Sequence, residues 1–282
     1  MTRARSHRLP KWSRNSATRG DVSVVPRRSL RRVDKAFEAR TQSKFLAARF
    51  TSCVANASND ATQEIQAALD AAATNKGGVV FLPTGLYCVA GHITVHGYTT
   101  LKGVWTAPPF NAPPSPPTLP SGSLDYGTTL LAVESQNNPN GAPFISLDGG
   151  GSAIEGLTVY YPNQTAPTTG TFAPKVYPYT IKANWGQAEI RNVMLFNPYQ
   201  GVDFFSVPNS GRHVVDGLWG QPIATGIRVD QSTDVTRISN VHFAPFWATS
   251  AQQPVLDWIQ THGRRDRRQC GASVQYSGNS RR

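Results

Sequence analysis

Residues 180–204 read TIKANWGQAEIRNVMLFNPYQGVDF, and they contain two short patterns that recur elsewhere in the chain. The first pattern has the form apolar-x-[Gly/Asn]-apolar, and its four copies begin at Ile154, Ile190, Val215 and Ile238. The intervals between these copies are 36, 25 and 23 residues. Self-similarity at such a period indicates one short structural unit that is repeated along the chain.

The second pattern, apolar-x-apolar, precedes every copy of the first by 9 to 13 residues. Its copies are Ile145-Ser146-Leu147, Ile181-Lys182-Ala183, Val202-Asp203-Phe204 and Ile227-Arg228-Val229. Short strands at intervals of about 20 to 40 residues, with no helices between them, predict stacked coils that bury their apolar residues against one another. The glycine or asparagine predicts a sharp bend, because these residues adopt a left-handed backbone most easily. A β-sandwich would instead show hairpins every 8–12 residues, roughly, which this chain does not.

A helix is predicted upstream of these repeats. Ile65, Ala68, Leu69 and Ala72 have the i, i+3, i+4, i+7 spacing of one apolar helix face. Asp60 with Gln63 is similar to a capping box, and Lys76-Gly77-Gly78 is a typical helix end. Short strands are expected to follow at 79–82, 86–89, 93–95 and 100–104.

The formal charge of +11 lies at the two ends of the chain. Residues 1–50 carry 14 basic and 3 acidic side chains, and residues 264–282 carry 6 arginines and one aspartate, whereas residues 51–263 carry 8 basic and 13 acidic ones. We therefore expect an Arg-rich extension at 1–57 that is disordered or misread, a β-helix domain at 58–263, and a basic, disordered or out-of-frame tail at 264–282. Because a nucleic-acid-binding fold carries its basic residues within the patterned region, we expect no nucleic acid at the core, and such binding through the ends is kept as an alternative.

Targeting signals and cysteines give little further information. No stretch approaches the ~20 apolar residues of a membrane span, and residues 33–50 lack the apolar core of a signal peptide. Cys53, Cys88 and Cys270 show neither metal-ligand spacing nor an even-numbered disulfide framework, so Cys88 is expected to be a small buried apolar residue. Because the repeat stops after Gly263 without a capping element, the chain is expected to be an N-terminal fragment of a longer β-helix.

Four segments carry a family resemblance: Asn59-Asp60-Ala61-Thr62, Ile65-Gln66-Ala67-Ala68-Leu69, GGVVFLPTGLY at 77–87, and Leu101-Lys102-Gly103. They resemble the opening of the pectate-lyase-like superfamily, in the style of its rhamnogalacturonase/epimerase-like members. The resemblance implies an all-β, right-handed parallel β-helix with an N-terminal capping α-helix. It also implies a carbohydrate-active protein that acts on or binds acidic polysaccharide, outside the cell or in the periplasm. The polygalacturonase motifs Asn-Thr-Asp, Asp-Asp, Gly-His-Gly and Arg-Ile-Lys are absent, and Gly211-Arg212-His213 does not replace them.

Candidate site residues follow from the outward positions of the coils. Catalytic candidates are Asp203, Asp230 and Arg228, a Ca²⁺ ion could be held by Asp203, Asp230 and Asp234, and substrate could be bound by Lys182, Arg212 and Trp219. Charged neighbours on adjacent coils could instead form two purely structural ladders, Lys182–Asp203–Arg228 and Glu155–Arg191–Asp216. His213 and His242 are expected to be structural.

The choice of function therefore stays open between a polysaccharide lyase or hydrolase and a non-catalytic, sugar-binding or structural β-helix of the tailspike or adhesin kind. The oligomeric state is open as well.

Overall fold

The computed structural model describes residues 53, 60–104, 127–165, 167, 169–204, 210–243 and 253–262, and the backbone of 274–276. The predicted extension at 1–57 and tail at 264–282 therefore lie outside the described residues, apart from Cys53 and the last short stretch. No helix in the described segments is long and apolar enough to cross a membrane.

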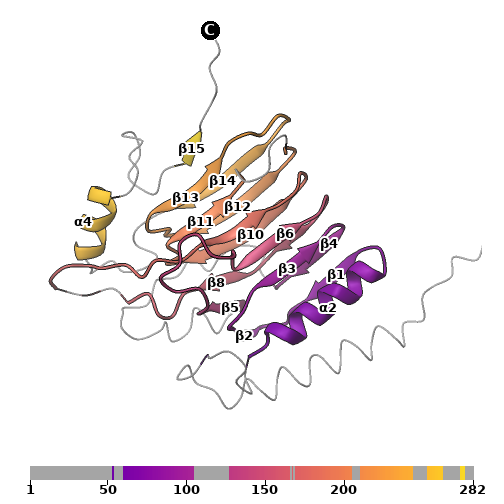
Figure 1. Ribbon diagram of the computed structural model, residues 1–282, viewed down its shortest axis with the longest axis horizontal. Helices are drawn as coiled ribbons and strands as arrows, with labels where there is room; N and C mark the ends of the chain where they lie inside the picture. The colour runs from indigo at the N-terminus through magenta and orange to yellow at the C-terminus, as the bar shows by residue number, and fades with distance from the viewer. Residues whose placement is uncertain are drawn as a thin grey trace, which may run out of the picture.

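The chain winds through six successive coils of short strands that pair only in parallel within the described parts (Figure 1). The first three coils contain β1 (Gly78–Phe81), β2 (Gly85–Val89) and β3 (Ile93–His96); β4 (Thr99–Lys102), β5 (Thr128–Ala132) and β6 (Ile145–Asp148); and β7 (Ala153–Glu155), β8 (Thr158–Tyr160) and β9 (Tyr179–Ala183). The last three contain β10 (Glu189–Phe196) and β11 (Gln200–Asp203); β12 (Val214–Gly220) and β13 (Thr225–Val229); and β14 (Arg237–Phe243) with β15 (Val274–Tyr276).

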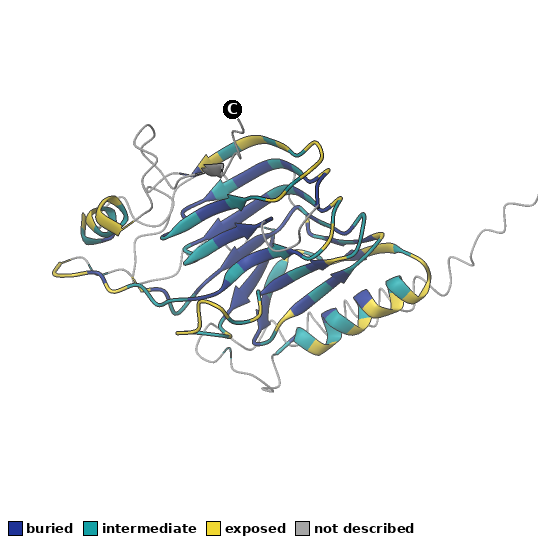
Figure 2. Ribbon diagram, turned by 45° about the horizontal axis from the view of Figure 1, so that its top comes forward, coloured by how far each residue is buried: buried dark blue, intermediate teal, exposed yellow. Residues whose placement is uncertain are grey.

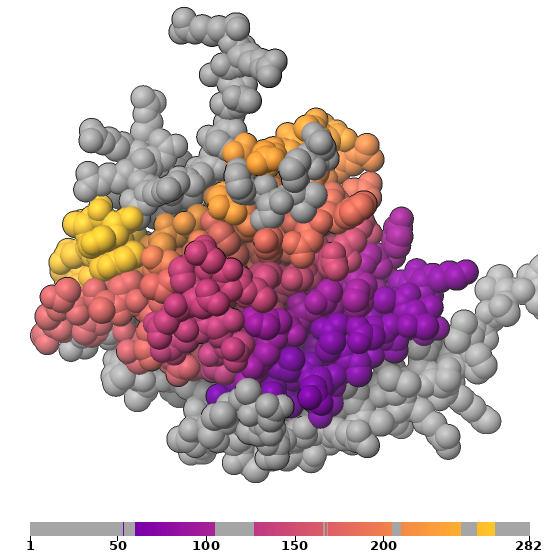
Figure 3. Space-filling model, in the orientation of Figure 1, coloured from indigo at the N-terminus to yellow at the C-terminus, as the bar shows by residue number. Residues whose placement is uncertain are grey.

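Each coil contributes one strand segment to each of three faces. The first face contains β1, β4, β7 and the first halves of β10, β12 and β14. The second face contains β2, β5, β8 and the second halves of the same three long strands. The third face contains β3, β6, β9, β11, β13 and β15. This mostly β architecture of curled parallel sheets is consistent with a parallel β-helix, and Figure 3 shows the coils as neighbouring bands from indigo to orange.

Both predicted apolar columns are in register in the structure. The third face aligns Ile145, Ile181, Val202 and Ile227, and all four are fully buried. The first face aligns Ile154, Ile190, Val215 and Ile238. These inward residues form one continuous core through the stack, shown as dark blue strands in Figure 2.

The bend between the first and second faces has the predicted left-handed backbone. The φ angles are 69° at Gly156, 50° at Asn192, 81° at Gly217 and 52° at Asn240. Glycine and asparagine alternate at these four positions, and the space between them is tight. A Cβ atom on Gly217 would lie 2.8 Å from Oδ1 of Asn192 and 2.4 Å from the ring of Trp219, so a larger residue would force one of these side chains to move.

The second face was not predicted as a separate column. Its inward residues Leu130, Val159 and Leu195 lie in register and are fully buried. In the third and fourth coils they stand only three residues beyond the bend glycine or asparagine, in the same apolar run as the first pattern.

The predicted helix is α2 (Thr62–Thr74), and it packs against β1, β3 and β4 at the first coil (Figure 1). Ile65 and Leu69 are fully buried in the core. The carboxylate of Asp60 accepts hydrogen bonds from the backbone N–H and the hydroxyl of Thr62, at 3.0 and 2.6 Å. The chain leaves the helix at Lys76 in a left-handed conformation (φ 67°).

Two further features differ from or add to the sequence predictions. Cys88 is buried, as expected, but it forms a disulfide with Cys53, a bond that was not predicted from the sequence. Spacing alone could not reveal this bond, because the fold brings together two residues that are 35 positions apart. A second helix, α4 (Gln253–His262), buries Val255 against Phe172 and Ile223.

Candidate functional site

The third face carries a partly buried ion pair between adjacent coils. The pairing of β11 with β13 places Asp203 beside Arg228. Nε and Nη2 of Arg228 donate to the two carboxylate oxygens of Asp203, both at 2.9 Å. Asp203 is only 1% exposed, while about a third (34%) of the Arg228 side chain is in contact with solvent. This two-pronged geometry fixes the guanidinium in one orientation at the surface.

The surroundings of Arg228 keep it positively charged. Its guanidinium carbon lies 5.0 Å from the centre of the Tyr179 ring, within the range of a cation–π contact. Partial burial by itself would lower the pKa of Arg228, but the hydrogen bonds and charge of Asp203, with Tyr179 and Asp230, raise it above the ordinary arginine value. Arg228 is therefore a permanent cation, and it does not accept a proton as a general base would.

Lys182 stands next to this pair. β9 pairs with β11 so that Lys182 aligns with Asp203, and β6 adds Ser146 to the same row. Among the described residues no ion pair with Lys182 is formed. Lys182 and Arg228 are two coils apart, about 10 Å along the stack. Two cations thus flank one carboxylate on the third face.

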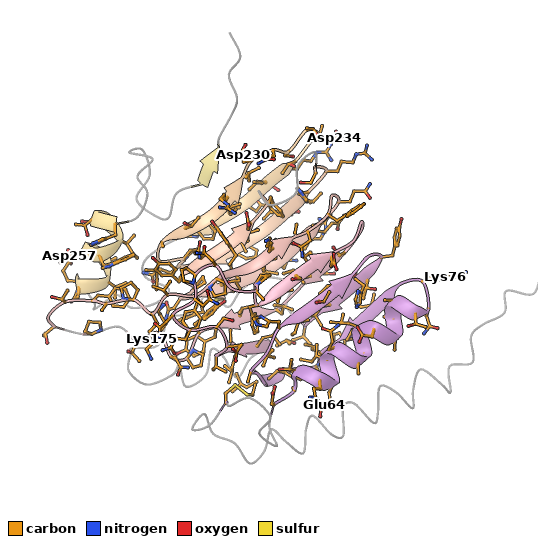
Figure 4. All side chains as sticks on the ribbon, viewed as in Figure 1. Glu64, Lys76, Lys175, Asp230, Asp234 and Asp257 are labelled. Carbon is orange, nitrogen blue, oxygen red and sulfur yellow. A yellow bond between two sulfur atoms is a disulfide. The ribbon has the colours of Figure 1, made fainter. Side chains whose placement is uncertain are left out.

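The structure does not bring the three predicted Ca²⁺ ligands together. Asp230 lies after β13, where its carboxylate accepts the N–H of Gln231 at 2.7 Å. Asp234 accepts a hydrogen bond from Arg212, and this bond and the N–H of Val235 lower the pKa of Asp234. Figure 4 shows both labelled residues at the end of the stack far from α2. Within the described part of the chain, no three His, Cys, Asp or Glu residues form a group that could hold a metal ion.

The three predicted substrate-binding residues are spread over different parts of the molecule. Lys182 lies on the third face, whereas Arg212 lies in the turn before β12 and is paired with Asp234. Trp219, on the second half of β12, packs with Met194 and Phe196 on the second face. Only Lys182 therefore shares a surface with the Asp203–Arg228 pair.

The first face carries the second predicted charge ladder, but its ion pairs differ in part from the predicted ones. Glu155 binds Lys102 of the preceding coil at 3.0 Å, while Arg191 binds Glu189 at 3.0 Å and Asp216 of the following coil at 3.7 Å. These side chains are 30–42% exposed, which is typical of ion pairs that contribute little to stability. On this face the structural ladder is the reading that the contacts support.

His213 is fully buried inside the stack. Its ring lies parallel to the ring of Phe204, with centres 4.4 Å apart, and its Nδ1 accepts the N–H of Ala188 at 3.4 Å. The hydroxyl of Ser210 is 3.4 Å from Nε2. Burial lowers the pKa of His213 to about 4, so the imidazole is neutral near pH 7. A buried, neutral ring that holds core groups has the structural role predicted for it.

Comparison with known proteins gives one match. Residues 52–114 match a family model described as "Rhamnogalacturonase A/epimerase, pectate lyase-like". No curated protein and no solved structure gives a significant match to the chain. The matched region contains the segments at 59–62, 65–69, 77–87 and 101–103, so the similarity to the pectate-lyase-like superfamily is confirmed over the helix and the first coil.

Proposed function

We propose that this protein binds an acidic polysaccharide along its third face, with Arg228 and Lys182 contacting the sugar carboxylates. The observation that carries this proposal is the orientation of Arg228, which the buried carboxylate of Asp203 holds through two hydrogen bonds. A guanidinium fixed in advance loses little conformational entropy when it meets a carboxylate. The pectate-lyase-like similarity of residues 52–114 supports a carbohydrate ligand.

The proposal also includes the handedness of the coils and the role of α2. We infer a right-handed winding, since crossovers between parallel strands of one sheet are almost always right-handed. We also infer that α2 acts as the N-terminal cap, since it covers the inward residues of the first coil with Ile65 and Leu69. In the outward row of the third face, Ser146, Lys182 and Arg228 are partly exposed, and these residues are the ones that a linear polymer would contact.

Binding is favoured over cleavage by the chemistry of the same pair. A lyase base must lose its proton, and Asp203 keeps Arg228 protonated. A hydrolase acid must reach the glycosidic oxygen, and Asp203 is buried with both carboxylate oxygens bonded to Arg228. Asp203 is therefore assigned a positioning role.

The test compares polygalacturonate with a neutral galactan, using Lys182→Gln and the matched control Lys102→Gln. Both variants remove one lysine charge, on the third and first faces respectively, and both leave the Asp203–Arg228 pair intact. We expect Lys182→Gln to weaken binding of polygalacturonate about three- to tenfold at low salt and Lys102→Gln to leave it unchanged. Equal binding of the neutral polymer, or equal effects of the two variants, would contradict the proposal.

An assay for unsaturated uronides, with and without Ca²⁺, tests the lyase alternative, and an assay for new reducing ends tests the hydrolase alternative. We expect no release. If the unaltered protein released products and Asp203→Asn did not, the Asp203–Arg228 pair would be catalytic, and the proposal of binding alone would be wrong.

A further inference from the structure

The outward side chains of the second face are apolar, and they are buried. Leu131, Tyr160, Met194 and Phe196 are between 5% and 8% exposed. They form a hydrophobic cluster separate from the core inside the coils, with Cys53, Leu86 and Trp219 packed at its edge. We call these seven residues the second-face cluster. Because they alternate with inward core residues, they point away from the coil interior.

A second layer must lie on this face. An outward side chain on a single-layered coil is in contact with solvent unless another segment covers it. Thr158 on the same face is fully buried, and within the described part of the chain its hydroxyl has no hydrogen-bond partner. The described helices do not provide the cover, since α2 packs on β1, β3 and β4, and α4 buries Val255 against Phe172 and Ile223.

The disulfide indicates which segment covers it. Cys88 lies on β2, in register with Leu131 of β5, and its partner Cys53 packs against the second-face cluster. The chain on the N-terminal side of Cys53 is therefore tethered to this surface. We propose that residues 30–52 dock on the second face and cover its apolar cluster.

The composition of residues 30–52 fits this surface. Six basic and two acidic residues, a net charge of +4, are interspersed with an apolar set: Leu30, Val33, Phe37, Phe45, Leu46 and Phe50. Residues 51–263 carry 13 acidic against 8 basic side chains, so the charges of segment and domain are complementary. The cluster extends over the first five coils, about 20 Å, which a segment of this length spans easily. Under this proposal, part of the Arg-rich extension would be a component of the fold.

Oxidation of Met194 tests the proposal in the full chain. Met1 and Met194 are the only methionines, so peroxide oxidation of Met194 is read directly by peptide mass spectrometry. The double variant Phe45→Asp/Leu46→Asp places two charges in the docking segment and leaves the disulfide in place. The matched control, Val24→Asp/Val25→Asp, makes the same chemical change in the same extension outside that segment. We expect oxidation of Met194 to be about tenfold faster in the first variant and unchanged in the control.

Three results would overturn this inference: equal protection in both double variants, protection that depends on protein concentration, or protection lost on Phe110→Asp. The second would assign the cover to another copy of the chain, and the third to the proline-rich segment at 108–120. A photoreactive benzoylphenylalanine at position 45 provides a measurement that does not depend on disruptive variants. We expect intramolecular cross-links to peptides of β5, β8 or β10; cross-links only between chains would overturn the inference.

Discussion

The first and second faces are built from the same strands, yet their outward rows have opposite chemistry. On β10, Arg191 on the first face is half-exposed and pairs with Glu189 and Asp216, while Met194 and Phe196 on the second face are apolar and buried. Inward, both faces contribute fully buried aliphatic residues to one core. The difference teaches that the inward residues determine how the coils stack, while the outward residues determine what each face contacts. The first face contacts solvent and neighbouring charges, and the second face contacts another apolar layer.

The largest expected effect compares two substitutions on β10. Phe196→Ala removes a buried aromatic ring that packs edge-on against Tyr160, and we expect it to lower the free energy of unfolding by about 3 kcal/mol. Arg191→Ala removes exposed ion pairs, and the expected loss is below about 1 kcal/mol. Chemical denaturation of both variants measures the difference. Equal losses would mean that the second face is not a buried layer.

Acid titration tests a polar group within the inward column. The folded pKa of His213, about 4, lies below its unfolded value of 6.5, so the folded state binds fewer protons between these values. The contribution of neutral His213 to the free energy of unfolding is complete above pH 6.5. It is lost as the pH falls toward 4, by up to about 3 kcal/mol. Asp70 and Asp234 have lowered pKa values, so their contributions are lost only below about pH 3.8. His213→Phe should flatten the stability curve between pH 6.5 and 4. The exposed His242→Phe serves as the control, and a curve unchanged by His213→Phe would contradict the assignment.

The third face is expected to fall between the other two. Asp203→Ala leaves Arg228 partly buried without its carboxylate, and we expect a loss of about 2 kcal/mol. A double-mutant cycle with Arg228→Ala should give a coupling energy of about 1–2 kcal/mol, because both single variants break the same two hydrogen bonds. A coupling near zero would remove Asp203 from its positioning role.

The smallest effect is expected for the first-face pair of Lys102 and Glu155. A cycle of alanine variants should give a coupling energy of about 0.5 kcal/mol or less, since both side chains are well solvated. The coupling should decrease further at high salt. A value as large as that of Asp203 and Arg228 would erase the distinction between the first and third faces.

Much of the fold could be predicted from the sequence because the inward residues set the register. The alignment of Asp203 with Arg228 follows directly from that of Val202 with Ile227, and both were expected. The second face was missed because Val159 and Leu195 continue the apolar run of the bend motif without a break in spacing. Helix α4 carried a detectable signal, since Val255, Trp258 and Ile259 have helical spacing.

The candidate site was only partly predictable, for a physical reason. Side chains on paired strands inherit their positions from the register, whereas Asp230 and Asp234 lie in the loop between β13 and β14, where hydrogen bonds to nearby backbone N–H groups orient them. The apolar residues at outward positions of the second face could have suggested that another segment covers it. The attachment of Cys53 to this face could not be predicted from the sequence, because it depends on a disulfide that the fold brings about.

The tight spacing at the bend has a consequence for folding fidelity. A Cβ atom on Gly217 would lie 2.8 Å from Oδ1 of Asn192, so any larger residue beside Asn192 forces a neighbouring side chain to move. If β14 paired with β10 in place of β12, Asn240 would take the position of Gly217 beside Asn192. The bend therefore disfavours a mispairing that the aliphatic residues Val215 and Ile238 alone would tolerate.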